Sequence, residues 1–384
     1  MSAYSIAGYG GMVADRVRTG AYVRALRQAI EPGAVVVDIG TGTGIFAMLA
    51  CQFGARRVYA IEPDDAIQVA REIAAANGFA DRIEFIQELS TKIVLPERAD
   101  VIVSDLYGVL PAYQHHVVSI ADARERLLAP RGQLIPQRST LWAAVTEAPE
   151  VYRRCARPWG EETHGVDMEW ARRIVTNTWS KRRIKPEQLL LPPQVWATLD
   201  YNSVTEADIH GEITWTVERP GTADGVAAWF DATLAEGIQF SNAPGEPELI
   251  YGNAYFPLSA PVPLETDDTV TVALHADLVR DDYVWRWNTR VLGKGNPESV
   301  KANFRQSTLA GTPLSPQQLR RRADNHIANL NEDGTIAQAI LERMARGMRN
   351  DDISREIAVQ FPHRYKKWQE ALTEVGELAT KYGR

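Results

Sequence analysis

The chain has 384 residues, with 42 Lys and Arg against 49 Asp and Glu and a net charge of -7. This length exceeds what one hydrophobic core usually serves and indicates two or three domains, and the acidic balance disfavours DNA or RNA as a partner. The sequence shows neither a run of 18 apolar residues nor a secretion signal, so we expect a cytoplasmic protein without membrane contact. Two cysteines, Cys51 and Cys155, are too few for a disulfide framework or a zinc site, and we expect no metal centre.

Short apolar runs alternate with helical patterns through residues 1–136, the first predicted domain. Such alternation is typical of a parallel sheet with helices on both faces, an α/β Rossmann-like fold. Ligands of these folds lie beyond the carboxyl ends of the strands, where Asp38, Glu62 and Asp105 stand in this chain. The predicted strands are Val35 to Ile39, Val58 to Ile61, Ile83 to Ile86, Val101 to Ser104 and Gln133 to Ile135.

The first of these runs continues into a glycine-rich turn, VVVDIGTGTGIFA. Gly40, Gly42 and Gly44 leave room for the backbone to approach a nucleotide-like ligand closely. Asp38 can accept hydrogen bonds from a cationic group, which suits the ammonium of an amino acid and repels a pyrophosphate. The turn therefore predicts S-adenosylmethionine as the cofactor.

Glu62 ends the second run about twenty residues beyond the turn, where an acid can hold a ribose diol. Dinucleotide enzymes share such an acid, and Gly42 to Ala47 formally fits their Gly-x-Gly-x-x-Ala pattern, so a nicotinamide dehydrogenase stays an alternative. The spacing of the glycines disfavours a dehydrogenase. When Gly40, the first glycine after the strand, is taken as the first glycine of that pattern, the third glycine position falls on Ile45.

Residues 137–310 change to period-two runs separated by Pro, Gly, Asn and Asp, which are typical of antiparallel strands. Many short strands predict a β-barrel domain packed beside the first domain. Four tryptophans in these runs either form an aromatic wall for a substrate or belong to the core, namely Trp215, Trp229, Trp285 and Trp287.

Residues 311–384 are patterned almost entirely as helices and predict a small C-terminal helical domain. In WQEALTEVGEL, Trp368, Leu372 and Val375 fall on one helix face. Part of the segment is similar to the helical half of winged-helix modules that recognise leader peptides. A DNA-binding helix-turn-helix and a plain oligomerisation or capping element remain open.

Three segments of the chain together resemble the catalytic core of the protein arginine methyltransferase family. They are VVVDIGTGTGIFAMLACQFGARRVYAIEP, IVLPERADVIVSDLYGVLP and RERLLAPRGQLIPQRSTLW. The resemblance implies S-adenosylmethionine as cofactor, with S-adenosylhomocysteine as product. It implies that the three glycines line the cofactor, that Glu62 holds the ribose, and that the loop from Glu88 to Thr91, with Ser90, borders the adenine.

The N-terminal segment YSIAGYGGMVADRVRTGAY resembles the helix that this family folds over its cofactor. By that likeness Tyr4 and Tyr9 wall the pocket, Met12 approaches the reactive centre, and Arg18 pairs with the cofactor carboxylate. A guanidinium group suits a carboxylate because it can bind in a bidentate manner.

The catalytic loop departs from the family pattern. The family grips its guanidinium substrate with two glutamates nine residues apart, and the matching positions here are Asp105 and Gln114. The family's Thr-His-Trp loop aligns with Leu249, Ile250 and Tyr251, so its histidine is absent. We therefore expect an acceptor other than arginine, with an oxygen or nitrogen nucleophile on a peptide or small molecule. Arginine methylation and a catalytically silent, cofactor-binding scaffold are the alternatives.

His115 and His116 follow Gln114, and either could act as a general base because histidine titrates near working pH. Adjacent helix residues point about 100° apart, so at most one should face the ligand. Asp105, at the end of a strand, is the stronger candidate for a catalytic group.

Residues 164–190 stand where the family inserts a helical arm that docks on a second subunit. The resemblance therefore implies a C2 homodimer. A peripheral helix that packs only on its own barrel is the alternative.

Overall fold

The computed structural model describes residues 5–160, 164–295 and 299–383. The chain divides into two compact units, Met1–Pro313 and Leu314–Arg384. In the described ranges, no helix combines the length and the apolar character that crossing a bilayer requires.

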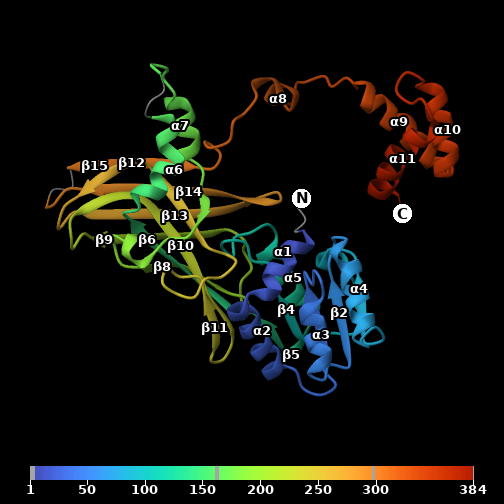
Figure 1. Ribbon diagram of the computed structural model, residues 1–384, viewed down its shortest axis with the longest axis horizontal. Helices are drawn as coiled ribbons and strands as arrows, with labels where there is room; N and C mark the ends of the chain where they lie inside the picture. The colour runs from blue at the N-terminus through green and yellow to red at the C-terminus, as the bar shows by residue number, and fades with distance from the viewer. Residues whose placement is uncertain (1–4, 161–163, 296–298, 384) are drawn as a thin grey trace. The chain divides into compact units, whose positions relative to one another are not determined.

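The larger unit contains a five-stranded parallel sheet in the order β3-β2-β1-β4-β5. Figure 1 labels β2, β4 and β5 of this sheet, with the helices that cover it. Every residue of β1 is buried, as expected for a central strand covered on both faces. The sheet confirms the predicted Rossmann-like fold, and its order reverses between β1 and β4, which is where such folds bind ligands. The strands are β1 Val35–Ile39, β2 Arg57–Ile61, β3 Ile83–Ile86, β4 Ala99–Ser104 and β5 Leu128–Ile135.

Helices cover this sheet and carry part of the site. Asp15 caps α2, and the helix then buries Ala21, Tyr22, Ala25 and Leu26, which share one face at helical spacing. The helices are α1 Ile6–Ala14, α2 Arg16–Ala29, α3 Ile45–Gln52, α4 Ala66–Ala76 and α5 His116–Arg126, with the 3-10 turn η1 Ser90–Lys92.

The predicted antiparallel region consists of two sheets. One has the order β7-β12-β10-β6-β8, with β11 paired to β10, and the other has the order β15-β14-β13-β9. Burial alternates along β14, as its period-two pattern predicts. The strands are β6 Arg138–Thr146, β7 Ser180–Arg182, β8 Gln194–Asp200, β9 Ile209–Thr216, β10 Gly221–Ala235, β11 Ile238–Ser241, β12 Asn253–Leu264, β13 Thr269–Val279, β14 Asp282–Leu292 and β15 Val300–Ser307.

The described strands do not close into the predicted barrel, because the two sheets keep separate hydrogen-bond ladders. They do come close at one edge, where a Cβ atom on Gly211 of β9 would lie 1.9 Å from the carbonyl oxygen of Trp196 in β8. A period-two pattern fixes which face of a strand is buried but not which edge it pairs with, so closure could not be predicted from it.

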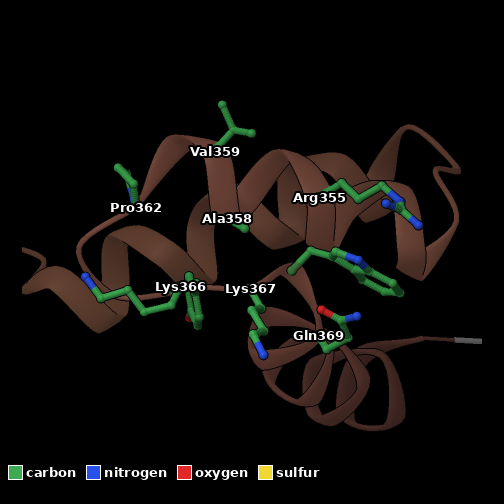
Figure 2. Close-up of a pocket in the computed structure, with 9 residues that line it drawn as sticks. Arg355, Ala358, Val359, Pro362, Lys366, Lys367 and Gln369 are labelled. Atoms are coloured by element: carbon green, nitrogen blue, oxygen red, sulfur yellow. The ribbon is translucent and has the colours of Figure 1, made fainter.

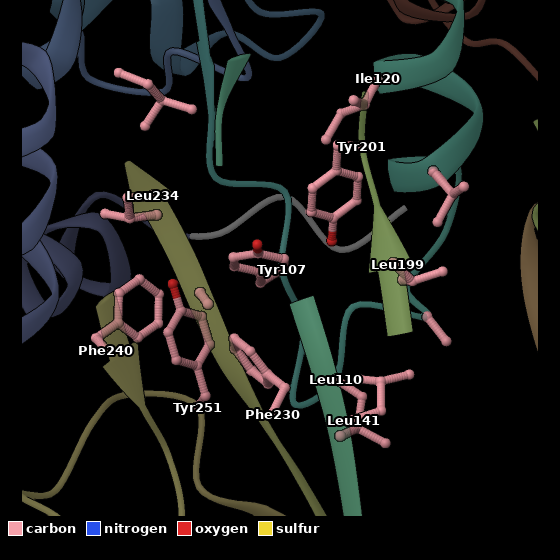
Figure 3. Packing of buried hydrophobic residues seen from close by; sticks show 14 of the residues in the cluster. Tyr107, Leu110, Ile120, Leu141, Leu199, Tyr201, Phe230, Leu234, Phe240 and Tyr251 are labelled. Atoms are coloured by element: carbon pink, nitrogen blue, oxygen red, sulfur yellow. The ribbon is translucent and has the colours of Figure 1, made fainter. Parts of the chain in front are cut away.

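One apolar core joins the parallel sheet to the antiparallel region (Figure 3). Tyr107, on the loop after β4, packs against Phe230 of β10 with ring centroids 4.8 Å apart, and Phe230 lies 5.4 Å from Tyr251. This packing places the loop that carries Tyr251 beside the carboxyl end of β4.

The segment predicted as a dimerisation arm contains α7 Glu169–Thr176, β7 and η3 Pro186–Gln188. It follows α6 Pro149–Ala156 and η2 Arg157–Trp159. Helix α7 contacts α6 and β12 of its own chain, yet Trp170 on α7 is 75% exposed.

The smaller unit is helical in its described residues and has its own core. Ile336, Ile340, Ile353, Ile357 and Val375 are fully buried in it. Its helices are α8 Pro316–Arg321, α9 Glu332–Ala345, α10 Asn350–Gln360 and α11 Trp368–Tyr382.

Candidate functional site

The turn between β1 and α3 has the backbone that its glycines predict. Gly40, Gly42 and Gly44 have φ angles of 73°, 52° and 85°, in the left-handed region that other residues avoid. A Cβ atom on Gly42 would lie 2.4 Å from the ring of Tyr9, and one on Gly40 would lie 2.3 Å from Leu106. Neighbouring side chains therefore approach the bare backbone of this turn.

Asp38 is the next-to-last residue of β1, just before the turn, and is almost fully buried. Its Oδ2 accepts hydrogen bonds from Thr41 Oγ1 at 2.6 Å and from the Ala47 amide at 3.0 Å. Its Oδ1 is buried without a partner in the described structure. Burial raises the pKa of Asp38 to about 7. A buried acceptor without a donor is costly, so this oxygen is suited to a ligand that brings its own N–H group.

Glu62 follows β2 and faces the same turn. It accepts hydrogen bonds from the Gly42 amide at 3.0 Å and from the Asp64 amide at 3.1 Å. Burial raises the pKa of this carboxyl. The two acids at the ends of β1 and β2 thus flank the glycine turn, as the parallel topology predicts.

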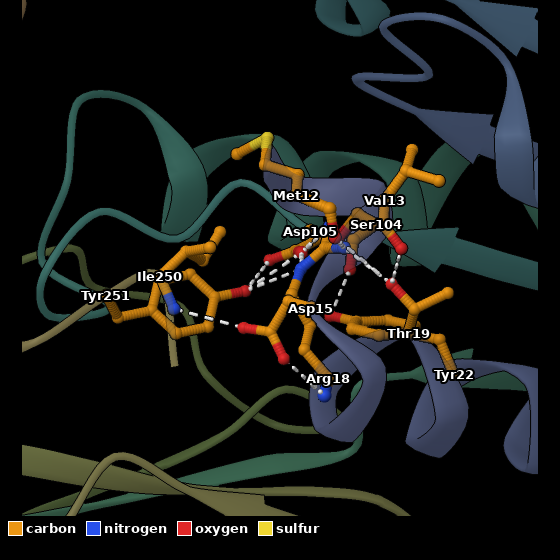
Figure 4. Close-up of polar contacts among 10 residues, drawn as sticks. All are labelled: Met12, Val13, Asp15, Arg18, Thr19, Tyr22, Ser104, Asp105, Ile250 and Tyr251. Atoms are coloured by element: carbon orange, nitrogen blue, oxygen red, sulfur yellow. Dashed lines mark hydrogen bonds and ion pairs between the residues drawn. The ribbon is translucent and has the colours of Figure 1, made fainter. Parts of the chain in front are cut away.

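Arg18, Asp105 and Tyr251 form a buried polar cluster at the end of β4 (Figure 4). Arg18 forms an ion pair with Asp105 and donates from Nε to the Tyr251 hydroxyl at 3.0 Å. The Tyr251 hydroxyl lies 2.8 Å from Asp105 Oδ1 and 2.9 Å from Oδ2 and donates to this carboxylate. Both carboxylate oxygens of Asp105 are therefore engaged.

The cluster keeps Arg18 charged in spite of its burial. Desolvation lowers the pKa of the guanidinium, but the negative charge of Asp105 and the Tyr251 hydroxyl raise it above its ordinary value. The Nη1 group also donates to the Met12 carbonyl at 3.0 Å.

Asp15 links the N-terminal helices to the loop that carries Tyr251. Its Oδ1 accepts from the Arg18 amide at 3.1 Å and its Oδ2 accepts from the Ile250 amide at 3.0 Å. Sequence reasoning missed Asp15 and noted Tyr251 only as the residue at the tryptophan position of the family's Thr-His-Trp loop. From the sequence, Asp15 could be recognised only as a possible helix cap. Its hydrogen bond to the Ile250 amide could not be predicted, because the two residues are 235 positions apart.

The structure places the loop residues after Asp105 in different surroundings. Gln114 has a φ of 43° and donates to the Tyr113 hydroxyl at 3.2 Å. His115 is exposed and lies 3.1 Å from Asp281. His116 is buried 3.0 Å from the Tyr201 hydroxyl, and burial lowers its pKa to about 3, so it stays neutral.

The remaining predicted cofactor residues lie around the turn and the N-terminal helices. Ser90 is buried at the start of η1, and its carbonyl accepts from Arg126 at 2.9 Å. Met12 and Tyr9 lie on α1. Tyr4 lies outside the described residues.

A cavity of about 370 Å³ adjoins the polar cluster and includes Tyr251 in its wall. Its walls are mainly aromatic and aliphatic, with Lys181 and Asp282 as the charged members. The four tryptophans of the sequence prediction, Trp215, Trp229, Trp285 and Trp287, are all buried, and of these four Trp285 also lines the cavity. The other aromatic side chains of the wall are Tyr107, Tyr113, Trp179 and Tyr283.

The parallel sheet order, the glycine turn and the acids at the strand ends are those expected of the S-adenosylmethionine-dependent methyltransferases, and the family matches show that the chain belongs to this class. Two family models match this chain. Residues 18–175 match the model for ribosomal protein L11 methyltransferase (PrmA), and residues 137–290 match the arginine methyltransferase oligomerization subdomain.

Curated relatives agree with these matches. Protein arginine N-methyltransferase PRMT10 of Oryza sativa subsp. japonica is 30% identical over 304 residues, which cover 68% of this chain and 78% of the relative. Probable protein arginine N-methyltransferase 6 of Arabidopsis thaliana is 30% identical over 61% of this chain. The chain spans 60% of the length of that relative and 66% of the length of human protein arginine N-methyltransferase 2.

Solved structures share the fold. Arabidopsis thaliana protein arginine methyltransferase 10 superposes with a TM-score of 0.69 at 24% identity, covering 79% of this chain and 97% of the other. The Trypanosoma brucei PRMT1 enzyme-prozyme heterotetrameric complex with AdoHcy gives 0.71 at 22% identity, covering 80% and 98%. The chain belongs to the protein arginine methyltransferase family, whose cofactor is S-adenosylmethionine.

Proposed function

We propose that this protein transfers a methyl group from S-adenosylmethionine to an oxygen or nitrogen atom of a peptide or natural product, at a site other than an arginine side chain. One observation carries the proposal. Of the two positions where the family grips a guanidinium, Asp105 is already neutralised by Arg18 and Gln114 is an uncharged amide bound to Tyr113. Even when Arg18 turns toward the cofactor, a guanidinium would meet one carboxylate here instead of two, so a neutral acceptor fits better.

The residues around the glycine turn fit the cofactor. Asp38 Oδ1 supplies an acceptor for its ammonium group, Glu62 an acceptor for its ribose diol, and Gly40, Gly42 and Gly44 a backbone that a ligand can approach. Ser90 is assigned to the adenine side, Tyr9 to the wall of the pocket and Met12 to the reactive centre. The bound cofactor supplies an electrophilic methyl group on a sulfonium.

Arg18 has two assigned partners in this proposal, the cofactor carboxylate and Asp105. When the guanidinium turns toward the cofactor, Asp105 keeps the Tyr251 hydroxyl as a donor and frees its Oδ2 to accept the acceptor's proton. Asp105 is then the proton-handling group, since general bases act within hydrogen-bond reach of the proton they remove.

The aromatic cavity beside Tyr251 is the proposed acceptor pocket. Mostly apolar walls with few polar groups are typical of small-ligand and side-chain sites. Tyr113, the partner of Gln114, lines this cavity. His115 contacts Asp281, which directly precedes the lining residue Asp282, so we assign Gln114 and His115 to the rim, with His115 as the second candidate base.

We further propose a homodimer formed through the arm. Residues 137–290 match an oligomerization subdomain. Trp170 on α7 is 75% exposed, and tryptophan is among the residues that are enriched at protein interfaces. Val166 nearby is 59% exposed and extends the apolar surface. A monomer in sedimentation at micromolar concentration would refute this assignment.

Arginine methylation is the second candidate, because the relatives are named arginine methyltransferases. A silent, cofactor-binding scaffold is the third, since Asp105 is fully engaged in the structure. These alternatives predict different methylated products, or none.

The test incubates the purified protein with methyl-labelled S-adenosylmethionine and three acceptors: an arginine-rich peptide, the same peptide with lysine for arginine, and an extract of the source organism. Mass spectrometry locates the label. Asp105→Asn tests the catalytic loop, and Glu125→Gln, which removes an exposed carboxylate on α5, is the matched control. Label on a non-arginine atom, lost only in Asp105→Asn, supports the proposal. Label on arginine alone supports the second candidate, and no transfer supports the scaffold.

A further inference from the structure

The smaller unit carries a groove that the methyl-transfer site does not use. The groove has a volume of about 750 Å³ and lies between α10 and the start of α11 (Figure 2). Ala358, Val359, Pro362 and Trp368 supply its apolar surface, and Val359 is 81% exposed. The remaining lining residues are Arg355, Tyr365, Lys366, Lys367 and Gln369.

Three exposed cations surround this apolar surface. The Arg355 guanidinium lies 4.2 Å from the centroid of the Trp368 ring. Among the residues that the structure describes, Arg355, Lys366 and Lys367 form no ion pair within 4 Å, whereas Arg343 pairs with Glu356. The groove thus carries three cationic side chains that form no ion pair with the described acidic side chains.

The acids near the groove are already engaged. Glu370 accepts from the Lys366 amide at 2.7 Å and from the Lys367 amide at 3.4 Å, and Glu374 binds the Tyr365 hydroxyl. These bonds hold the start of α11 and the buried Tyr365 ring in place. The groove is consequently a formed surface with positive charge at its rim.

We propose that this groove binds an acidic segment of the peptide acceptor, with carboxylates at Arg355, Lys366 and Lys367 and an apolar side chain against Val359 and Trp368. Charge complementarity selects this occupant, and a cation stacked on an indole strengthens contact with aromatic residues. The inference rests on the proposed function only in assigning the segment to the methyl acceptor. Holding the acceptor by a second site raises its local concentration at the first.

Nucleic acid fits the groove less well. Residues 314–384 hold 12 Lys and Arg against 10 Asp and Glu, which is close to balance. Binding to a phosphate backbone grows with the number of phosphates neutralised, and three cations beside an apolar surface neutralise few. DNA is therefore an outcome that the test must distinguish.

The test measures fluorescence anisotropy of a labelled 15-residue probe of Glu, Leu, Phe and Gly with the full-length protein. Lys366→Glu and Lys367→Glu together should weaken probe binding about tenfold or more, because two attractions become repulsions. Arg346→Glu is the control, since Arg346 is exposed at the end of α9 and does not line the groove. Replacing Glu by Lys in the probe should abolish binding.

Equal binding of the probe to all variants, or binding of the lysine probe, would overturn the docking proposal. So would tight binding of a labelled DNA duplex that depends on the same two lysines. S-adenosylhomocysteine affinity is measured alongside and should stay unchanged in every variant. Probe binding in a protein that transfers no methyl group would refute the proposed function and leave the groove assignment unaffected. Methyl transfer in a protein that does not bind the probe would refute the groove assignment alone.

Discussion

Replacing Asp105 with asparagine is the sharpest test of the polar cluster. The Arg18 and Asp105 side chains are 5% and 3% exposed, so the change leaves a buried guanidinium without its anionic partner. Removing one partner of a buried ion pair costs about 3 to 5 kcal/mol. Because the Tyr251 hydroxyl and the Met12 carbonyl still contact Arg18, we expect a loss of about 3 kcal/mol in the free energy of unfolding.

The same change should strengthen cofactor binding. In our proposal the cofactor carboxylate and Asp105 compete for Arg18, and Asp105→Asn removes the competitor. We expect S-adenosylhomocysteine to bind about tenfold more tightly, which corresponds to about 1.4 kcal/mol. Ligand at 100 times its dissociation constant should then restore about 2.7 kcal/mol of stability. Turnover should fall about a hundredfold or more, because general acid–base groups contribute about that much.

Urea unfolding with and without S-adenosylhomocysteine measures the stabilities, and calorimetry measures the affinities. Glu125→Gln provides the control, because it removes a carboxylate from the exposed surface of α5. Unchanged stability together with unchanged affinity would contradict the idea that Arg18 depends on the charge of Asp105. Full turnover in Asp105→Asn would remove this residue from the chemistry.

Three further predictions concern the acids and a buried histidine. Glu62→Ala should weaken S-adenosylhomocysteine binding by about 2 kcal/mol in calorimetry, through the lost ribose contact; unchanged affinity would reject the ribose role. Because the pKa of Asp38 is raised to about 7, binding of S-adenosylhomocysteine should weaken by up to about tenfold per pH unit below 7, where the carboxyl must first lose a proton. Methylthioadenosine, which lacks the amino acid, should show no such dependence if Asp38 binds the ammonium. The pKa of His116 falls from 6.5 to about 3 on folding, so below pH 6.5 only the unfolded chain takes up its proton, and stability falls by about 1.4 kcal/mol per pH unit. Urea unfolding of His116→Asn from pH 7 to pH 5 should lack this loss of stability. Equal slopes of unfolding free energy against pH for His116→Asn and the unsubstituted protein would refute the prediction.

The parallel sheet could be predicted from the sequence because each strand is fixed by local information. Val35–Ile39 is apolar except at Asp38, as suits a strand buried on both faces, and glycines in the left-handed region follow it. Topology then brings Asp38 and Glu62 to one edge of the sheet without any long-range detail. The fold of the parallel sheet and the positions of these two acids can thus be predicted from short segments of the sequence.

The polar cluster could not be predicted in the same way, because its members are far apart in the chain. Arg18 and Asp105 are separated by 87 positions, and Arg18 and Tyr251 by 233. Their contact depends on how the antiparallel region packs on β4 through Tyr107 and Phe230. No local pattern encodes that packing. Likewise, the positive φ of Gln114 and its contact with Tyr113 depend on the loop conformation, which a spacing of nine residues does not reveal.

The cluster also bears on why substrate charge and cofactor binding should be coupled in this protein. A single buried guanidinium neutralises Asp105 and, in our proposal, also pairs with the cofactor carboxylate. When the guanidinium turns to the cofactor carboxylate, Asp105 is left as the one carboxylate of the two family positions, because Gln114 carries no charge. A guanidinium acceptor would then lie beside both Arg18 and the sulfonium, with the carboxylate of Asp105 alone to bind it. Like charges in a poorly solvated site repel strongly, so this arrangement opposes arginine as the acceptor. Restoring a second carboxylate in Gln114→Glu should lessen that opposition, and arginine-peptide turnover that rises in this variant while S-adenosylhomocysteine affinity stays constant would show that charge, rather than shape, selects the acceptor.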